Sequence, residues 1–421
     1  MRVFKFGGAS VKDAEGIRNL IHVLDTEGVE NTMMIISAMG KMTNAFEKVV
    51  NSYLYEKENL KNSLNYIEGY HTEITKELFE NEHPIFHEVK RLIDNLQGFL
   101  IQNTSKDYDY VYDQVVSYGE LLSTKIISSF LEKEKISNQW LDIRTILKTD
   151  SNYRNATVNW EETTSNLEKL DSNTLYITQG FISSDNKNHT TTLGREGSDY
   201  TAGILAYCLD AESVTIWKDV DGVLNADPRV FDETILLKNI SYQEAIEMAF
   251  YGASVIHPKT IKPLENKRIP LYVRSFKNLK NSGTKVSKGI DLQPNINCFI
   301  VKKNQILVSI STNDFSFMVE ENISAIFKLL HDFKLKVNLI QHSAISFSVC
   351  LEDGYRNFSK FYEKLHPNFK AKYNTNITLF TVRHFDDNSI KVIQRKGDVL
   401  LQQTSREIVQ LAIAEKNNYV N

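Results

Sequence analysis

A lysine and two glycines follow one another at the end of the first apolar segment. Val3–Phe6 reads as a short buried strand that carries Lys5, and Gly7 and Gly8 come directly after it. A lysine in a buried strand is costly unless an anionic group meets it. Glycines let backbone N–H groups approach a ligand closely. Together these residues predict a phosphate site, although a single lysine at a strand end is more often a surface charge.

Four further polar segments stand beside expected strands and helices. They are Ser37–Asn44, Tyr118–Glu120, Thr190–Asp199 and Trp217–Arg229. In an open α/β sheet, ligands bind beyond the carboxyl ends of the strands. We therefore expect these segments to meet the Lys5 turn at that edge.

Taken singly, the same residues have ordinary structural interpretations. Ser37 and Thr43 are also helix-cap residue types, and Asp227 before Pro228 is also a turn pair. Glu120 and Asp199 would be solvated helix charges, and Arg195 would be a surface loop residue. His257 would be a packing or capping histidine rather than a ligand.

Three common ligand motifs fail on spacing. Gly40–Lys41 is not a Walker P-loop, since Ile35 stands where its first glycine belongs. We find no GxGxxG after a strand, which argues against a Rossmann dinucleotide site. Asp219–Gly222 suggests an EF-hand, but Trp217 would be the first ligand and Pro228 the twelfth.

Composition narrows the class of protein. The 421 residues predict two or three domains, and 42% hydrophobic with 24% charged residues is typical of a globular protein. A net charge of −4 argues against a dedicated nucleic-acid binder. Three dispersed cysteines without a CxxC pair indicate a reducing compartment and no structural zinc. With no long apolar run and no room for a signal peptide before the first strand, we expect a cytoplasmic protein without a membrane segment.

The first two thirds of the chain alternate between strand and helix signals. The continuous apolar run Met33–Ala38 is typical of a strand buried on both faces. Residues 43–135 read as helical, with a break at His83–Pro84. Further strands are expected at Gln139–Asp142, Thr174–Ile182, Val214–Lys218 and Leu271–Ser275, with a helix at Ser198–Leu209. This order predicts an α/β fold, a three-layer αβα sandwich with a mostly parallel sheet.

The pattern changes after the polar stretch Lys277–Asn297, where we place the domain boundary. We expect one domain over residues 1–290 and an α+β region over 300–421. Its first part has the order βαββαβ, a split βαβ module: strands at Ile306–Ser311, Lys336–Gln341, Ile345–Leu351 and Ile377–Val382, and helices around Ile323–Leu330 and Phe358–Leu365. The following segments, Ile390–Gln394, Leu400–Gln403 and a helix from Arg406, are too short for a second complete module.

The motifs in order resemble those of aspartate kinases of the amino-acid kinase superfamily. KFGGAS is similar to the family's KFGGTS, and SAMGKMTN, YGE, TTTLGREGSD, KDVDGVLNADPR and MAFYGASVIHP follow at the family's approximate spacing over residues 1–290. The joint occurrence outweighs the single-residue interpretations. The βαββαβ region resembles the family's ACT regulatory domain, with a shortened second ACT unit.

The resemblance implies a reaction and a set of site residues. Aspartate kinases transfer the γ-phosphoryl of ATP, with Mg²⁺, to the side-chain carboxylate of L-aspartate, the first step toward lysine, threonine and methionine. By resemblance the catalytic residues are Lys5 and Asp199, and the substrate-binding residues are Ser37, Thr43, Glu120 and Arg195. The cofactor-binding residues are Gly7, Gly8, Lys218, Asp219, Leu224, Asp227, Arg229 and Ser254, and no residue is assigned as a protein metal ligand. The resemblance also implies a homodimer and an amino-acid effector at the ACT region, without nucleic-acid or membrane partners.

The chain departs from the family at three positions. Ser254 stands where many members have a lysine that neutralises ATP phosphate charge. Lys218 stands where many have threonine, and we hypothesise that it supplies the displaced charge. Glu196 occupies a position where glycine is usual.

Two alternative functions stay open at this point. One is another amino-acid kinase of the same fold. The other is a degenerate kinase that acts as a non-catalytic amino-acid sensor, which Ser254 and Glu196 favour. Five intact residues oppose it: Lys5, Thr43, Glu120, Arg195 and Asp199.

Overall fold

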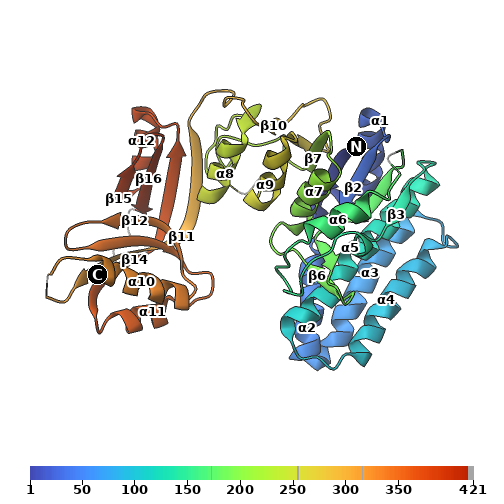
Figure 1. Cartoon of the computed structure of the whole chain (residues 1–421), viewed down its shortest axis with the longest axis horizontal. Helices are drawn as coiled ribbons and strands as arrows, with labels where there is room; N and C mark the ends of the chain where they lie inside the picture. Colours follow the sequence, from blue (N-terminus) through green and yellow to red (C-terminus); the bar gives the residue numbers. More distant parts are fainter. Residues whose placement is uncertain (172, 254–255, 315, 416–421) are drawn as a thin grey trace. The chain divides into compact units, whose positions relative to one another are not determined.

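The computed structural model describes residues 1–421 except 172, 254, 255, 315 and 416–421. The chain forms two compact units (Figure 1). The first comprises residues 1–223, 236–246 and 255–294, and the second comprises residues 224–235, 247–254 and 295–421. Within the described ranges, every helix is too short or too polar to span a lipid bilayer.

The first unit is built on an eight-stranded sheet with the order β3-β4-β2-β1-β7-β9-β10-β8. Its strands are β1 (Arg2–Phe6), β2 (Thr32–Ile36), β3 (Gln139–Leu141), β4 (Tyr176–Gln179), β7 (Ser213–Lys218), β8 (Asn239–Ser241), β9 (Leu271–Ser275) and β10 (Thr284–Ser287). All pairs are parallel except β9 with β10. A separate hairpin pairs β5 (Ile182–Ser184) with β6 (Thr190–Thr192).

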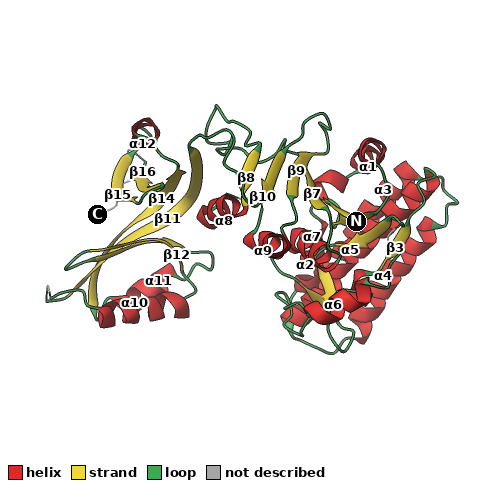
Figure 2. Ribbon diagram, turned by 45° about the horizontal axis from the view of Figure 1, so that its top comes forward, coloured by secondary structure: helices red, strands yellow, loops and turns green. Residues whose placement is uncertain are grey.

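Two groups of helices flank this sheet (Figure 2). Helices α1 to α5 pack on one another, as do α6, α7 and α9. The first group is α1 (Ala14–Glu27), α2 (Met42–Leu54), α3 (Leu60–Leu78), α4 (Ile85–Gln102) and α5 (Tyr108–Lys133). The second group is α6 (Trp160–Leu167), α7 (Gly197–Cys208) and α9 (Pro258–Lys267). Short 3₁₀ turns lie at Gly8–Val11, Lys57–Asn59 and Ile143–Thr145. The predicted αβα sandwich is confirmed.

The core of the first unit explains why its central strands form. All five residues of β2 are buried, as expected for a parallel strand covered on both faces. Strand β1 ends at Phe6, whose ring stacks on that of Trp217 in β7 at a centroid distance of 6.0 Å. These contacts fix the carboxyl ends of β1, β2 and β7 side by side, where the polar segments begin.

The second unit contains a six-stranded antiparallel sheet with the order β12-β13-β11-β14-β16-β15. Its elements are β11 (Cys298–Thr312), α10 (Glu320–Asp332), β12 (Lys336–His342), β13 (Phe347–Glu352), α11 (Phe358–Leu365), β14 (Phe369–Arg383), α12 (Asp387–Gln394), β15 (Asp398–Thr404) and β16 (Ile408–Ala414). Helix α8 (Tyr242–Tyr251) is divided between the two units. The predicted βαββαβ order is confirmed from β11 to β14.

One detail after β14 differs from the expectation. The helix predicted from Arg406 is wrong, because Ile408–Ala414 forms the buried strand β16, which pairs with β14 on one edge and with β15 on the other. Ile390–Gln394 belongs to α12, which Asp386 and Ser389 begin with reciprocal capping bonds. Strands β11 and β14 pair along almost their whole length with a register shift near Gln305, so the same two strands serve both halves of this sheet.

Candidate active site

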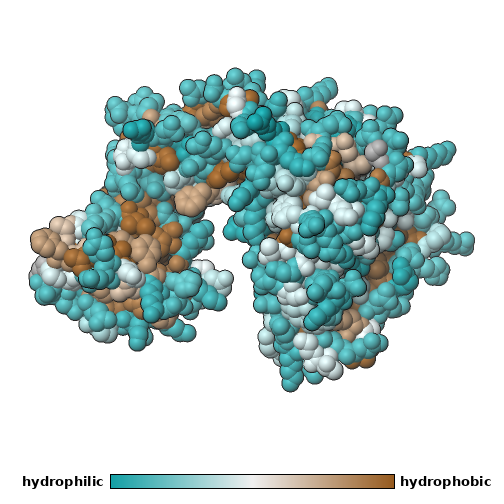
Figure 3. Space-filling view, viewed as in Figure 1, coloured by the Kyte–Doolittle hydropathy of each residue, from teal (hydrophilic) through white to brown (hydrophobic). Residues whose placement is uncertain are grey.

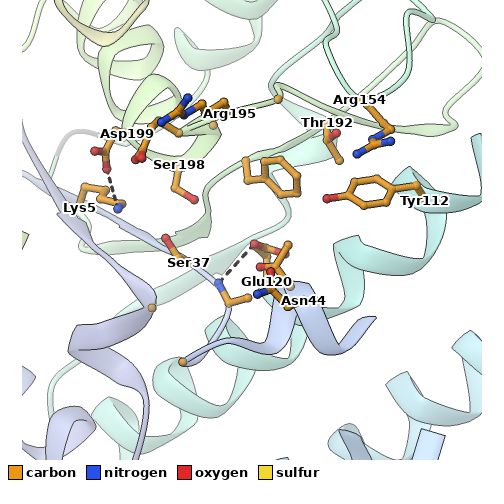
Figure 4. A pocket seen from close by; sticks show the side chains of 18 residues that line it. Lys5, Ser37, Asn44, Tyr112, Glu120, Arg154, Thr192, Arg195, Ser198 and Asp199 are labelled. Carbon is orange, nitrogen blue, oxygen red and sulfur yellow. Dashed lines mark hydrogen bonds and ion pairs between the residues drawn. The ribbon is translucent and has the colours of Figure 1, made fainter. Parts of the chain in front are cut away.

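A pocket of about 620 Å³ opens at the carboxyl ends of the central strands of the first unit. It is lined by residues that follow β1, β2 and β6, by α2 and α5, and by the first turn of α7 (Figure 4). The lining residues are Lys5, Gly8, Ser37, Ala38, Gly40, Thr43, Asn44, Tyr112, Glu120, Arg154, Phe181, Thr192, Gly194, Arg195, Glu196, Gly197, Ser198 and Asp199. The structure therefore brings together seven residues predicted for the site: Lys5, Gly8, Ser37, Thr43, Glu120, Arg195 and Asp199.

Lys5 and Asp199 form a buried ion pair in this pocket. The Lys5 Nζ lies 2.6 Å from Asp199 Oδ1, and Lys218 Nζ lies 3.6 Å from Asp199 Oδ2. Burial by itself would raise the pKa of the Asp199 carboxyl, but the two ammonium groups overcome that effect and hold the pKa below its ordinary value. The carboxylate thus orients two cations at one end of the pocket, where they can neutralise an anionic ligand.

The glycine turn after β1 lies against the turn after β2. A Cβ on Gly8 would stand 2.7 Å from both the Ala38 and Gly40 carbonyl oxygens, which no side chain tolerates. Gly7 lies next to the Lys5 ammonium, since a Cβ there would be 3.4 Å from Nζ. This close backbone approach leaves room for a phosphoryl group beside the lysine.

Glu120 provides a buried carboxyl at the floor of the pocket. It comes from α5, and its Oε1 accepts a hydrogen bond from the Ala38 N–H at 3.4 Å. Oε2 is buried without a hydrogen-bond partner among the described residues. Burial raises the pKa of Glu120 to about 8, while the Ala38 hydrogen bond acts in the opposite direction. An orphaned buried oxygen facing a pocket is a site for a cationic or hydrogen-bonding ligand.

Ser37, Thr43 and Asn44 complete the floor. Ser37 follows β2, and its carbonyl accepts a hydrogen bond from Ser123 Oγ at 2.8 Å. The helix-cap interpretation of Ser37 and Thr43 is wrong, because Lys41 is the N-cap residue of α2 and makes no side-chain capping bond. Both residues line the pocket instead.

The loop before α7 carries Arg195 and Glu196. Arg195 is exposed, and Glu196 adopts the left-handed conformation with φ of 54°, which costs a non-glycine residue about 1 kcal/mol. His257 caps α9 by accepting from the Lys259 N–H at 3.1 Å, so the interpretation as a capping residue is confirmed. Burial, followed by the charges of Lys259 and Arg195, lowers the pKa of His257.

The remaining predicted nucleotide residues divide between the two units. Lys218 ends β7 in the first unit, and the exposed Asp219 follows it. Leu224, Asp227 and Arg229 belong to the second unit, where Arg229 Nη2 pairs with Asp227 Oδ2 at 2.7 Å. Ser254 lies outside the described residues.

Sequence reasoning missed the wall formed by Tyr112, Arg154 and Thr192. The Arg154 guanidinium lies 4.3 Å from the centroid of the Tyr112 ring. Asp113 holds this wall, since it accepts hydrogen bonds from the Arg154 N–H at 3.0 Å and the Thr192 hydroxyl at 2.7 Å. Burial raises the pKa of Asp113 to about 7 against these hydrogen bonds. The sequence carries only a weak signal for these residues, because a loop arginine and a helical tyrosine match no short motif.

Comparison of the sequence with known proteins identifies the family of this chain. Residues 1–275 match the model of the amino acid kinase family. The chain is 32% identical to lysine-sensitive aspartokinase 3 of Escherichia coli (strain K12), over 83% of this chain and 78% of that protein. It is 29% identical to the chloroplastic bifunctional aspartokinase/homoserine dehydrogenase 2 of Arabidopsis thaliana over 87% of this chain. It spans about two fifths of the length of the bifunctional relatives, 42% in that case.

Solved structures agree over nearly the whole chain. E. coli aspartokinase III in complex with lysine and aspartate superposes with a TM-score of 0.82 at 26% identity, covering 98% of this chain and 96% of that one. The same enzyme in complex with aspartate and ADP gives a TM-score of 0.80 with the same coverage. The chain belongs to the amino acid kinase family and, within it, to the aspartokinases.

Proposed function

We propose that this protein is an ATP-dependent phosphotransferase that phosphorylates the side-chain carboxylate of L-aspartate, giving 4-phospho-L-aspartate. The observation that carries the proposal is one pocket with two complementary ends. The Lys5–Asp199 pair beside the glycine turn suits a phosphoryl group, and the uncommitted Oε2 of Glu120 suits an ammonium group. We place this reaction at the start of lysine, threonine and methionine synthesis.

The residues at the phosphoryl end act by charge and position. The attacking carboxylate of aspartate is already ionised at pH 7, so the reaction needs no strong general base. Lys5 would neutralise charge on the transferring phosphoryl group while Asp199 holds its ammonium in place. The N–H groups of Gly7 and Gly8 would contact the phosphoryl oxygens. Catalysis then consists mainly of alignment and electrostatic stabilisation.

The residues at the other surfaces of the pocket would recognise the amino acid. Glu120 would pair with the substrate ammonium, and the Ser37 and Thr43 hydroxyl groups would donate to its carboxylates. Arg195, whose planar fork matches a carboxylate, would bind a substrate carboxylate group. A ligand with one ammonium and two carboxylates fits this set of groups better than a monocarboxylic amino acid.

ATP and Mg²⁺ are the proposed cofactors. The E. coli relative was solved with aspartate and ADP, and Lys218 reaches the same carboxylate as Lys5. We assign Lys218, Asp219, Leu224, Asp227, Arg229 and Ser254 to the nucleotide. Among the described residues, no three His, Cys, Asp or Glu side chains are grouped as a metal site, and Mg²⁺ would be held largely by phosphate oxygens and water, where it neutralises phosphate charge.

We further propose a catalytic domain over residues 1–290 and a regulatory ACT region over 300–421, with a shortened second ACT unit that has α12 as its helix. Apolar side chains gather on the second unit, at the left of Figure 3. Ile340 on β12 is 38% exposed, Ile345 in the loop after β12 is 46% exposed, and Phe317 in the loop between β11 and α10 is 71% exposed. This surface supports a homodimer and an amino-acid effector site. The small number of cysteines, dispersed along the chain without a CxxC pair, supports a cytoplasmic location.

The test is ATP- and Mg²⁺-dependent formation of hydroxamate from L-aspartate, with L-glutamate as the competing acceptor. We expect turnover with aspartate and a loss of roughly a hundredfold or more in Lys5→Ala, because that variant lacks the phosphoryl-stabilising cation. Folded protein that turns over neither acceptor would favour the sensor function. Equal turnover of glutamate would favour another amino-acid kinase.

A further inference from the structure

The loop that carries Asp227 and Arg229 folds as part of the second unit. Residues 224–235 belong to that unit, although the chain directly before and after them belongs to the first. A hydrogen bond from the Asn225 N–H to the Ile235 carbonyl, at 3.0 Å, closes the loop at its base. We call residues 224–235 the nucleotide loop, because Asp227 and Arg229 are assigned to the nucleotide above.

The tip of the nucleotide loop is one compact turn with a charged pair on its surface. Asp227 accepts from the Arg229 N–H at 2.9 Å and from Arg229 Nη2 at 2.7 Å. The N–H groups of Val230 and Phe231 both donate to the Asp227 carbonyl, at 2.9 and 3.0 Å. The Arg229 side chain is 83% exposed. The turn therefore presents its charged pair to solvent, directly before two apolar residues.

Those two apolar residues pack on the half of the second unit that contains α12. Phe231 lies 5.0 Å from Phe299 of β11 and 6.5 Å from Phe380 of β14, measured between ring centroids, within the range of favourable aromatic pairs. Lys396, which follows α12, has its Nζ 4.7 Å from the Phe231 ring centroid. Val230 and Phe231 are partly buried against one cluster on α12, β14 and β16 (Figure 1): Phe380, Val382, Ile393, Val409, Leu411 and Ile413.

Hydrogen bonds from Asn225 tie the base of the loop to the same sheet. The Asn225 carbonyl accepts from the Phe299 N–H at 2.7 Å, and its Nδ2 donates to the Asn297 carbonyl at 3.1 Å. Its Oδ1 accepts from the Ile235 N–H at 2.7 Å. The side chain is buried, so each of these bonds also avoids the cost of an unpaired polar group. The loop is thus held at its base by Asn225 and at its tip by Val230 and Phe231.

This packing orders the loop before a ligand arrives. Fixing the backbone of one residue costs about 1–2 kcal/mol in conformational entropy. A binding segment that is already ordered by its own fold does not charge that cost to the ligand. Contacts that order the turn therefore raise the affinity for whatever binds its charged pair.

We infer that the α12 half of the second unit supports the nucleotide loop, and that Val230 and Phe231 are positioning residues that hold Asp227 and Arg229 for ATP. The inference rests on the proposed function, since it takes ATP as the phosphoryl donor. It gives the shortened second ACT unit a part in donor binding.

The experiment compares Phe231→Ala and Phe231→Leu with the control Phe385→Ala. Phe385 is partly buried against the same cluster, but it comes from the segment between β14 and α12. The KM values for ATP and for aspartate and kcat are measured by hydroxamate formation. Calorimetric titration gives the dissociation constant of ADP, and chemical denaturation reports the stability of each variant.

We expect Phe231→Ala to raise the KM for ATP and the dissociation constant of ADP about tenfold, the result if the fraction of molecules with an ordered loop falls to about a tenth. The KM for aspartate should stay as in the wild type, because the residues assigned to aspartate belong to the first unit. Phe231→Leu should restore most of the affinity. Unchanged ADP affinity in Phe231→Ala, or an equal loss in Phe385→Ala, would overturn the inference.

A double-mutant cycle tests whether Phe231 acts through the charged pair. In the Arg229→Ala background, Phe231→Ala should weaken ADP binding less than it does in the wild type, because part of what it positions is already gone. An undiminished effect would show that Phe231 acts by another route and would overturn the inference.

Two further arms keep the test decisive. If Phe231→Ala unfolds, Val230→Ala carries the comparison, with a smaller loss of ADP affinity expected and an unchanged affinity rejecting the inference. If the wild type binds ADP but does not turn over aspartate, the proposed function fails, and the ADP titrations still decide the inference. A wild type that binds neither ATP nor ADP would overturn both.

Discussion

Acid pH should weaken the binding of L-aspartate because Glu120 must ionise to receive an ammonium group. Burial raises the pKa of Glu120 to about 8, partly offset by the Ala38 N–H. In the empty pocket at pH 7, most molecules therefore carry the neutral carboxylic acid. The substrate ammonium favours the carboxylate, so binding drives out a proton.

The size of the effect follows from that pKa. The apparent dissociation constant contains the factor one plus ten raised to (pKa − pH), so with a pKa of about 8 it is about 2-fold above its alkaline limit at pH 8, about 11-fold at pH 7 and about 100-fold at pH 6. At pH 7 this corresponds to about 1.4 kcal/mol. Because the empty-state pKa lies above the pKa of the complex, affinity rises with pH through this window and levels off above it.

Isothermal titration of aspartate between pH 6 and 8.5 measures the apparent dissociation constant at each pH. Repeating it in two buffers with different ionisation enthalpies gives the number of protons released on binding. We expect release of about 0.9 proton per site at pH 7. Glu120→Gln should bind more weakly and lose this slope. Asp113, whose pKa burial raises to about 7, titrates nearby, and any slope left in Glu120→Gln belongs to it. A wild-type affinity that is constant over this range, without proton release, would refute the role of Glu120.

Three further predictions concern the phosphoryl end of the pocket. Lys218→Ala should raise the KM for ATP roughly tenfold, because it removes a cation 3.6 Å from Asp199. A normal KM and turnover would reject the hypothesis that Lys218 supplies the charge that many family members carry at the position of Ser254. Glu196→Gly should raise the free energy of unfolding of the first unit by up to about 1 kcal/mol, because φ of 54° suits glycine; chemical denaturation measures it, and a destabilised variant would contradict the argument. Gly8→Ala should abolish turnover in a folded protein, because its Cβ would meet two carbonyl oxygens at 2.7 Å; activity within twofold of wild type, a change too small for such a clash, would show that the turn can adjust.

Local patterns were sufficient to predict the fold of the first unit. The apolar run that became β2, the glycine turn after Lys5 and the polar segments after other strands each depend on neighbouring residues. Parallel strands bring their carboxyl ends to one edge. Residues from distant segments, such as Lys5, Glu120 and Asp199, therefore meet in one pocket as expected.

Other features depend on contacts that no local pattern reports. The wall of Tyr112 and Arg154 exists because buried Asp113 ties two loops together. In the second unit, β11 and β14 run through both halves of one sheet. A prediction that assigns each strand to a single module therefore fails to recognise β16 as a strand of this sheet. Ile408–Ala414 could be recognised as a strand only with its neighbours β14 and β15 in place.

The identity of the acyl phosphate tests the central claim most directly. Purified protein is incubated with ATP, Mg²⁺ and L-aspartate, the product is trapped with hydroxylamine, and the hydroxamate is identified by mass spectrometry against the α and β isomers. The account predicts the β-hydroxamate, formed only with ATP and lost in Lys5→Ala. The α isomer, or no hydroxamate from folded protein, would contradict it.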